Sequence, residues 1–249
     1  MGFHATITIN RCEDCVTRSN SCVGWLYSAG GCEPSGNVGS TLLERGQHLF
    51  HSGDPVTSVY ILRSGALKTY VTSPDGEEQI LAFFSAGDVV GLDGLADGHH
   101  SRNTIALIAT EVCRIPVERL MQSCSRNPEL QGRLLEGMGR EIQRLQGMLR
   151  LERLTAEQRV VYFLLNQARR QARTDSHDSR CIVRLAMSRG EIGRFLDLAT
   201  ETVSRCLTRL QTLGLIAINR NEIELLDVRR LQRMAQAPSG EGAERRVAA

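Results

Sequence analysis

The middle of the chain alternates short apolar runs with turn residues. The runs cover residues 59–62, 66–71, 79–84, 89–90, 104–108 and 112–115. Glycine-containing turns separate them, at Ser52-Gly53-Asp54, Arg63-Ser64-Gly65, Pro74-Asp75-Gly76 and Ala86-Gly87-Asp88. Strand-length runs with turn signals every 8 to 12 residues or so are typical of an antiparallel barrel or sandwich. We therefore predict a β-rich sensor domain over residues 41–126.

A long amphipathic helix is predicted next, over residues 127–152. Asn127 is placed to cap it, and Pro128 suits the first helical position. Its apolar stripe is Leu130, Leu134, Met138, Ile142, Leu145 and Leu149. Such a stripe fits an ordinary core helix, but the position between two unlike domains favours a self-associating connector. We expect dimerisation through Leu134, Met138, Ile142, Leu145 and Leu149.

The pattern of residues 153–232 predicts a winged helix-turn-helix. Two capping boxes, Thr155 with Gln158 and Ser188 with Glu191, begin helices. A tight turn leads into a helix over 200–213, which Gly214 ends, and a small hairpin follows over 216–226. Residues 233–249 are expected to be a disordered tail, whereas residues 1–40 form a Gly- and Ser-rich segment with four cysteines.

The helix over 200–213 has two unlike faces. Its apolar side chains, Val203, Cys206, Leu207 and Leu210, follow the i, i+3, i+4, i+7 spacing of a buried face. The opposite face then consists of Glu201, Ser204, Arg205 and Thr208, residue types that read base edges. A solvated face with a Glu201–Arg205 ion pair is the plain alternative. Nearby arginines favour DNA, and we expect phosphate contacts from Arg189, Arg194, Arg209 and Arg220.

Composition narrows the class of protein. The 249 residues carry a formal net charge of only +2, so DNA contact has to come from a local patch. We find neither a long apolar span nor a secretory signal, and we expect a cytoplasmic protein without membrane contact. A nucleophile with its base, a phosphate loop and a metalloprotease helix are all missing from the motifs, so we do not expect an enzyme. Eight cysteines in a reducing compartment point to metal or redox chemistry.

The segment MSRGEIGRFLDLATETVSRCLTRLQTLGLIA, residues 187–217, resembles the DNA-binding domain of the CRP/FNR family of regulators. Glu201, Ser204 and Arg205 match that family's E-x-x-S-R pattern, and the resemblance runs from about Leu43 to Leu226. It implies an α+β fold: an N-terminal β-roll like that of cyclic-nucleotide-binding domains, a long dimerisation helix and a C-terminal winged helix-turn-helix. It also implies a homodimer on double-stranded DNA of the type TTGAT-nnnn-ATCAA, whose half-sites lie about 10 base pairs apart.

The resemblance distinguishes between two signals. Cyclic-AMP-binding members hold the phosphate with an Arg-Ser pair and a Gly-Glu. Here His100 stands before Ser101 at the arginine position, and Gly87-Asp88 replaces Gly-Glu, which disfavours a cyclic nucleotide.

The oxygen-responsive FNR branch is more similar, as at Gly98-His99-His100. This likeness implies an oxygen-labile 4Fe-4S cluster on Cys12, Cys15, Cys22 and Cys113, and contact of residues 76–78 with RNA polymerase.

Alternatives to this assignment stay open. Cys32 is a second candidate for the fourth ligand. The same thiolates suit structural zinc, and thiol redox sensing or a cyclic-nucleotide response would use the same fold. Cys124, Cys181 and Cys206 stand in apolar or helical contexts and are expected to be small packed residues, and His99 and His100 are expected to be loop residues.

Overall fold

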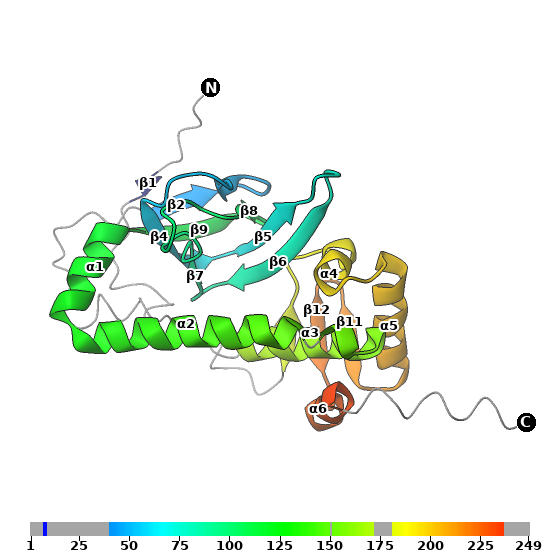
Figure 1. Cartoon of the computed structure of the whole chain (residues 1–249). Coiled ribbons are helices and arrows are strands. Elements are labelled where there is room, and N and C mark those ends of the chain that lie inside the picture. The colour runs from blue at the N-terminus through cyan, green and yellow to red at the C-terminus, as the bar shows by residue number, and fades with distance from the viewer. Residues whose placement is uncertain (1–6, 9–39, 150, 172–180, 237–249) are drawn as a thin grey trace, which may run out of the picture. The chain divides into compact units, whose positions relative to one another are not determined.

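The computed structural model describes residues 7–8, 40–149, 151–171 and 181–236. Its contacts divide the chain into two units, with the division after Glu141. The fold is α+β, as predicted, with strands and helices in both units (Figure 1). None of the described helices has the length and apolar character needed to span a membrane.

The N-terminal unit contains two antiparallel sheets. The first has the order β1-β2-β9-β4-β7, and the second has the order β3-β8-β5-β6. The strands of the first sheet are β1 (Ile7–Thr8), β2 (Ser40–Leu43), β9 (Thr110–Pro116), β4 (Ser58–Ser64) and β7 (Val89–Val90). Those of the second are β3 (His48–Phe50), β8 (Asn103–Ala106), β5 (Ala66–Thr72) and β6 (Glu78–Ser85). The four predicted turns each have a glycine at positive φ, at residues 53, 65, 76 and 87.

Apolar side chains of β4 and β9 point to both faces of the first sheet, so both faces are apolar. Leu62 and Val112 belong to a cluster that also contains Phe50, Leu67 and Ala106 from the second sheet. On the other face, the neighbouring strand positions Val59, Ile61, Cys113 and Ile115 form a second cluster with Leu120, Leu130 and Leu134. Because successive side chains of a strand point to opposite faces, one strand supplies both clusters.

Two helices cover that second face. They are α1 (Val117–Arg126) and the first part of α2 (Pro128–Leu149). Helix α1 was not predicted from the sequence, although Val117, Leu120, Met121 and Cys124 have helical spacing. Asn127 caps α2 as predicted, because its Oδ1 accepts from the backbone N–H groups of Glu129 and Leu130 at 3.1 and 3.2 Å.

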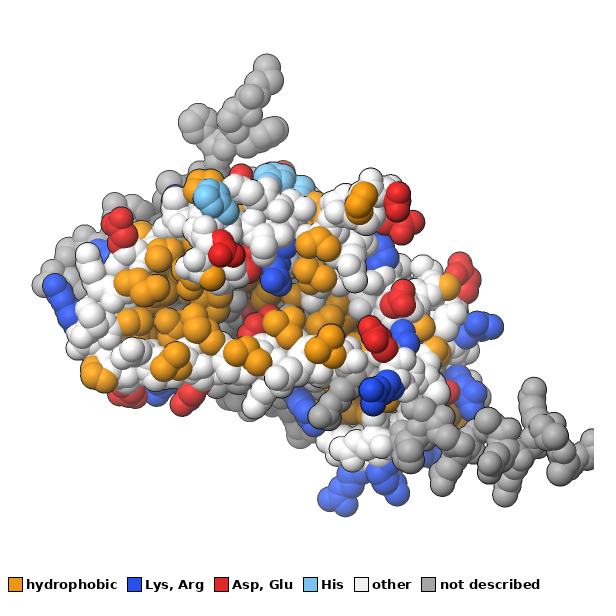
Figure 2. Space-filling view, in the orientation of Figure 1, with side chains coloured by type: hydrophobic (Ala, Val, Ile, Leu, Met, Phe, Trp, Pro, Cys, Tyr) orange, Lys and Arg blue, Asp and Glu red, His pale blue; other side chains and the backbone are white. Residues whose placement is uncertain are grey.

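The apolar stripe of α2 faces two ways. Leu130 and Leu134 are only 1% and 7% exposed and pack inside the subunit, so the expectation that Leu134 faces a partner helix is wrong. Met138 also packs against this inner cluster. In contrast, Leu135, Ile142, Leu145 and Leu149 are 41% to 73% exposed. Apolar side chains gather over α1 and α2 on the face seen in Figure 2. The stripe is wide enough for one edge to pack inside the subunit while the other edge is exposed.

The C-terminal unit packs around α3 (Ala156–Gln171), whose Val160, Val161, Phe163 and Leu164 are buried. Residues 142–149 of α2 belong to this unit. The other elements are η3 (Leu151–Arg153), β10 (Ile182–Arg184), α4 (Arg189–Leu196), α5 (Thr200–Thr212), β11 (Ile216–Asn219), β12 (Glu222–Leu225) and α6 (Val228–Gln236). The strands form a small sheet in the order β10-β12-β11.

Both predicted capping boxes are present. Thr155 N–H donates to Gln158 Oε1 at 2.9 Å, and Ser188 N–H donates to Glu191 Oε2 at 2.9 Å. One difference lies at the C-terminal end, where α6 continues through Gln236, four residues into the segment expected to be a tail. Burial of Leu231 and a 3.2 Å hydrogen bond from Gln158 Nε2 to the carbonyl of Met234 hold this helix on α3.

We predict that Gly132→Ala stabilises the protein by about 0.5–1 kcal/mol, because alanine has the higher helix propensity. Gly132 lies inside α2, and a Cβ added there meets no atom within 4 Å. Gly139→Ala should behave alike, since its surroundings are equally open. Thermal unfolding of the two variants measures the effect, and a lowered midpoint in both would contradict it.

We predict the opposite for Gly193→Ala, which should cost about 1–3 kcal/mol. Gly193 lies in α4, where an added Cβ would stand 2.5 Å from the carbonyl oxygen of Leu198 in the turn before α5. Gly190→Ala in the same helix is the matched control, because its nearest atoms lie at 3.5 Å or beyond. Urea unfolding compares them, and equal stabilities would refute the close approach of α4 to the turn.

Candidate nucleic-acid interface and cysteine site

The turn between α4 and α5 is held by its own backbone. Leu198 N–H donates to the carbonyl of Gly193 at 2.9 Å, and Asp197 takes a left-handed conformation with φ of 54°. Asp197 ends α4, and Thr200 begins α5 three residues later. The start of α5 is therefore tied to the end of α4.

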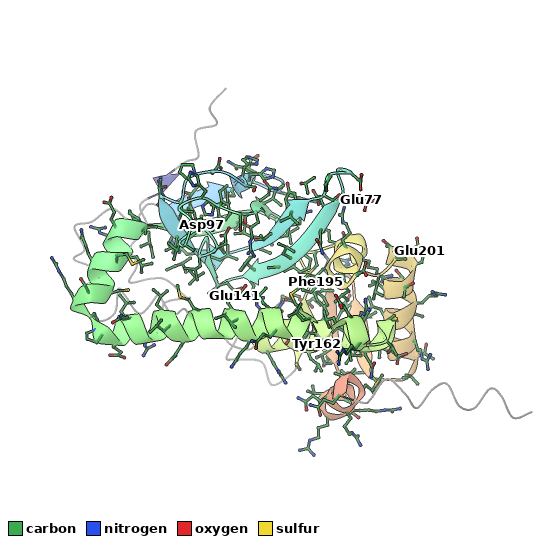
Figure 3. All side chains as sticks on the ribbon, in the orientation of Figure 1. Glu77, Asp97, Glu141, Tyr162, Phe195 and Glu201 are labelled. Carbon is green, nitrogen blue, oxygen red and sulfur yellow. The ribbon has the colours of Figure 1, made fainter. Side chains whose placement is uncertain are left out.

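Burial of one face of α5 determines which side chains point outward. Val203, Leu207 and Leu210 are 0%, 3% and 0% exposed. Glu201, Arg205 and Thr208 are exposed on the opposite face, and Figure 3 shows Glu201 at the outer end of α5. The arrangement of a buried and an outward face matches the sequence prediction.

The side-chain hydrogen bonds of Arg205 and Thr208 stay within α5. Arg205 Nη2 donates to Thr202 Oγ1 at 3.3 Å, and in the described part of the chain no ion pair joins Arg205 to Glu201. Thr208 Oγ1 donates to the carbonyl of Ser204 at 3.0 Å. A shallow open groove is lined by Ser204, Arg205, Thr208, Arg209 and Thr212. This groove therefore presents hydroxyl and guanidinium groups to an incoming ligand.

The four expected phosphate-binding arginines lie on α4, on α5 and in the β11–β12 turn. Arg189 lies at the start of α4, and its Nη1 is 3.4 Å from Ser204 Oγ. Arg209 Nε is 3.2 Å from Glu157 Oε2, although its side chain is 71% exposed. Arg194 is exposed on α4, and Arg220 is exposed in the β11–β12 turn with φ of 53°. These positions place positive charge on α4, α5 and the hairpin.

Cys113 is the described member of the predicted cysteine set. It lies on β9, is 9% exposed, and belongs to the cluster under α1 and α2. Cys12, Cys15, Cys22 and Cys32 lie outside the described residues, and among those described no group of three potential metal ligands converges. The choice between Cys113 and Cys32 therefore stays a prediction.

The strand register places Thr8 and Ser40 near Cys113. Ser40 pairs with Cys113 across β2 and β9, and Thr8 pairs with Ser40 across β1 and β2. Adjacent strands lie about 4.8 Å apart, so the two ends of the 9–39 connection start about one and two strand spacings from Cys113. Cys12 follows Thr8 by four residues in the sequence.

The other described cysteines are partly buried. Burial raises the pKa of the thiols of Cys124, Cys181 and Cys206 above the ordinary value. At Cys206 the carboxylate of Glu157 adds to this rise, whereas Arg205 and Arg209 oppose it. A raised pKa keeps a thiol protonated at neutral pH and makes it a poor nucleophile and ligand.

His100, which stands at the position of the phosphate-binding arginine of cyclic-AMP-binding members, contacts side chains of this chain. His100 lies in a loop, as predicted, but its side chain is only 3% exposed and its ring stacks on Phe50 with the ring centroids 3.6 Å apart. Its Nδ1 lies 3.4 Å from Asp93 Oδ1. Asp93 Oδ2 accepts from the backbone N–H and Oγ of Ser101 at 3.0 and 3.3 Å. A carboxylate at this place disfavours an approaching phosphate.

The other half of the expected nucleotide motif is also occupied. Asp88 Oδ2 accepts from the backbone N–H of Ser85 at 2.7 Å and so closes the turn before β7. Asp88 therefore has a structural partner in the turn where cyclic-AMP-binding members have a glutamate.

Each unit contains a stretch that matches a known protein family. Residues 41–127 match a family described as "Cyclic nucleotide-binding domain", and residues 158–234 match one described as "Crp-like helix-turn-helix domain". The transcriptional activator protein Anr of Pseudomonas protegens is 46% identical over 187 residues, which cover 74% of this chain and 75% of that protein. The fumarate and nitrate reduction regulatory protein of Escherichia coli K12 is 36% identical over 210 residues, 83% of each chain.

A solved structure is also similar. FixK2 from Bradyrhizobium japonicum superposes with a TM-score of 0.70 and is 29% identical, over 80% of this chain and 97% of that one. Identity above 30% over three quarters of the relatives, together with both matched domains, shows that the chain belongs to the CRP/FNR family of transcription regulators.

Proposed function

We propose that the chain is an oxygen-responsive regulator that binds a TTGAT-nnnn-ATCAA palindrome as a homodimer while a 4Fe-4S cluster is intact. Cys12, Cys15, Cys22 and Cys113 would hold the cluster. The similarity to Anr and to the fumarate and nitrate reduction regulatory protein supports the class of regulator. The observation that carries the sensing proposal is the strand register that leads the cysteine-bearing segment from Thr8 and Ser40 to Cys113.

The donor set fits the proposed group. Four thiolates are the ligands that iron-sulfur clusters take, and zinc accepts the same set. When bound, an iron-sulfur cluster supplies a centre that oxygen can dismantle. Cys113 is well placed for this role because it pairs with Ser40, which in turn pairs with Thr8, and these two residues are the strand ends that flank the segment. Cys124, Cys181 and Cys206 are elsewhere in the fold, on α1, before β10 and on α5.

Packing links Cys113 to the long helix. Cys113 shares one apolar cluster with Leu130 and Leu134 from the first two turns of α2. Because interiors are densely packed, a displacement of the Cys113 strand has to be met by a movement of these leucines. The state of the cysteine site would thus alter the seating of α2 on the sheet.

The outward edge of α2 is suited to a second copy of the chain. Ile142, Leu145 and Leu149 are 56%, 41% and 73% exposed, and Leu135 is 61% exposed. Burying such a side chain contributes about 1.5–3 kcal/mol, and a twofold dimer buries each of them twice. We assign dimerisation to these positions, with Met138 at the border of the inner cluster.

The outward face of α5 would read each half-site. Glu201, Ser204 and Arg205 would contact base edges, and Thr208 would lie beside them in the groove. Arg189, Arg194, Arg209 and Arg220 would contact phosphates. Glu77, exposed at the tip of the β5–β6 hairpin in Figure 3, belongs to the segment that we propose for RNA polymerase contact.

We predict that Cys113→Ser abolishes the bound cluster in protein purified without oxygen. Iron, sulfide and visible absorbance should be lost. Affinity for the palindrome should fall about 100-fold, as expected if only about 1% of the protein stays in the conformation that binds DNA. Cys124→Ser is the matched control, because Cys124 packs against the same apolar cluster but lies on α1.

The same measurements distinguish the alternatives. If Cys113→Ser keeps its iron and Cys32→Ser loses it, the fourth ligand is Cys32. Zinc in place of iron and sulfide would identify a structural metal. Operator affinity of the unaltered chain that does not change on exposure to air would refute the oxygen switch.

We predict different losses for two arginines of the DNA-binding surface. Arg205→Ala should cost about 1–3 kcal/mol of operator binding and relax specificity at one base pair of each half-site. Arg189→Ala should weaken all sequences alike and reduce the slope of log affinity against log salt by about 0.9 per subunit. Binding titrations on single-base operator variants at several salt concentrations measure both, and a uniform loss in Arg205→Ala would argue against base reading.

A further inference from the structure

Arg159, in the first turn of α3, donates to backbone carbonyls of two separate segments. Its Nε donates to Leu154 at 3.2 Å and its Nη2 to Glu152 at 3.3 Å, both in the segment that follows α2. Its Nη1 donates to Leu196 at 3.0 Å and lies 3.4 Å from the carbonyl of Asp197. One guanidinium therefore bridges the exit from α2 and the turn of the helix-turn-helix.

The chemistry of arginine makes this bridge stiff. The last carbonyls of a helix lack partners within the helix and carry partial negative charge, so a cation at the end of α4 is favourable. The planar guanidinium directs several N–H groups in fixed directions, whereas a lysine ammonium is a single point of charge on a flexible stem. Arg159 therefore fixes the position of one segment relative to the other as well as joining them.

A second contact fixes the end of α2 in the same place. Gly147 lies in the last turns of α2, and a Cβ added there would overlap the hydroxyl of Tyr162 on α3. Figure 3 shows Tyr162 on α3, three residues after Arg159. The absent side chain at Gly147 thus lets α2 and α3 approach closely. We call these two contacts, Arg159 with its carbonyls and Gly147 with Tyr162, the joint.

We infer that the joint determines which half-site spacing the regulator accepts, with Arg159 as a positioning residue. This inference rests on the proposed function, in which α2 pairs with its twin and two copies of α5 read a palindrome. The path from α2 to α5 runs through residues 151–154, Arg159 and the α4–α5 turn. Adding one base pair to the spacer moves a half-site by about 3.4 Å and rotates it by about a tenth of a turn. A stiff joint rejects that change, and a loosened one tolerates it.

The test compares affinities of the full-length chain, purified without oxygen, for palindromes with three, four and five spacer bases and for DNA with one half-site. We expect Arg159→Lys to reduce the preference for four bases about tenfold, the effect of losing one charged hydrogen bond. Affinity for the single half-site should stay within about twofold, because the reading face of α5 is unaltered. Arg229→Lys, exposed on α6, is the matched control and should keep the preference.

A second pair of variants does not depend on Arg159. Gly147→Ala should also reduce the spacing preference, and adding Tyr162→Phe should restore it, because that change removes the atom which the new Cβ would overlap while the ring carbon at 3.5 Å stays in ordinary contact. An unchanged preference in both Arg159→Lys and Gly147→Ala, whether or not their melting temperatures fall, would overturn the inference. If the unaltered chain bound a palindrome no better than one half-site, the proposed function itself would fail.

Discussion

Burial of one face of α5 is the constraint on which the DNA-binding surface depends. Val203, Leu207 and Leu210 are almost completely inaccessible, so the helix cannot rotate about its axis without exposing them. With that face fixed, the side chains that can reach another molecule are fixed too, and Arg205 is among them. The remaining freedom of the helix is rigid-body movement with its unit. This is why contacts that lie far from the reading face, such as those of Arg159, bear on recognition.

The parts of the fold that could be predicted are those with local signals. The capping boxes at Thr155 and Ser188 and the apolar spacing within α5 depend on residues a few positions apart, and the structure confirms them. The packing partners of α2 were harder to predict, because an apolar stripe shows that a helix packs against something but does not identify the partner. Leu134 faces its own sheet because α1 directs the chain back along that sheet, and α1 had not been predicted from the sequence.

The residues of the candidate sites also differ in whether a local sequence pattern predicts them. The outward residues of α5 follow from helical periodicity, whereas the burial of His100 depends on Phe50 in a distant strand and on Asp93 in the preceding loop. Arg159 gave no signal at all, because its partners are backbone carbonyls, two of them 37 and 38 residues away, and any residue type can supply a carbonyl. The spacing of the cysteines left Cys113 and Cys32 as candidates for the fourth ligand. The pairing of β1, β2 and β9, which no local pattern predicts, favours Cys113.

Under the proposed function, α2 would connect the cysteine site to the DNA-binding unit. Its first turns share an apolar cluster with Cys113, and its last turns contact Tyr162 in the C-terminal unit. A helix transmits a shift or rotation along its axis well because its backbone hydrogen bonds are internal. Such transmission requires a firm connection at both ends, since a loose end would absorb the movement. Dense packing at Leu130 and Leu134 supplies one connection, and the close approach at Gly147 with the carbonyl contacts of Arg159 supplies the other. A Cβ added at Gly132 or Gly139 would meet no atom within 4 Å, so neither glycine takes part in these connections, which depend on the side chains that pack.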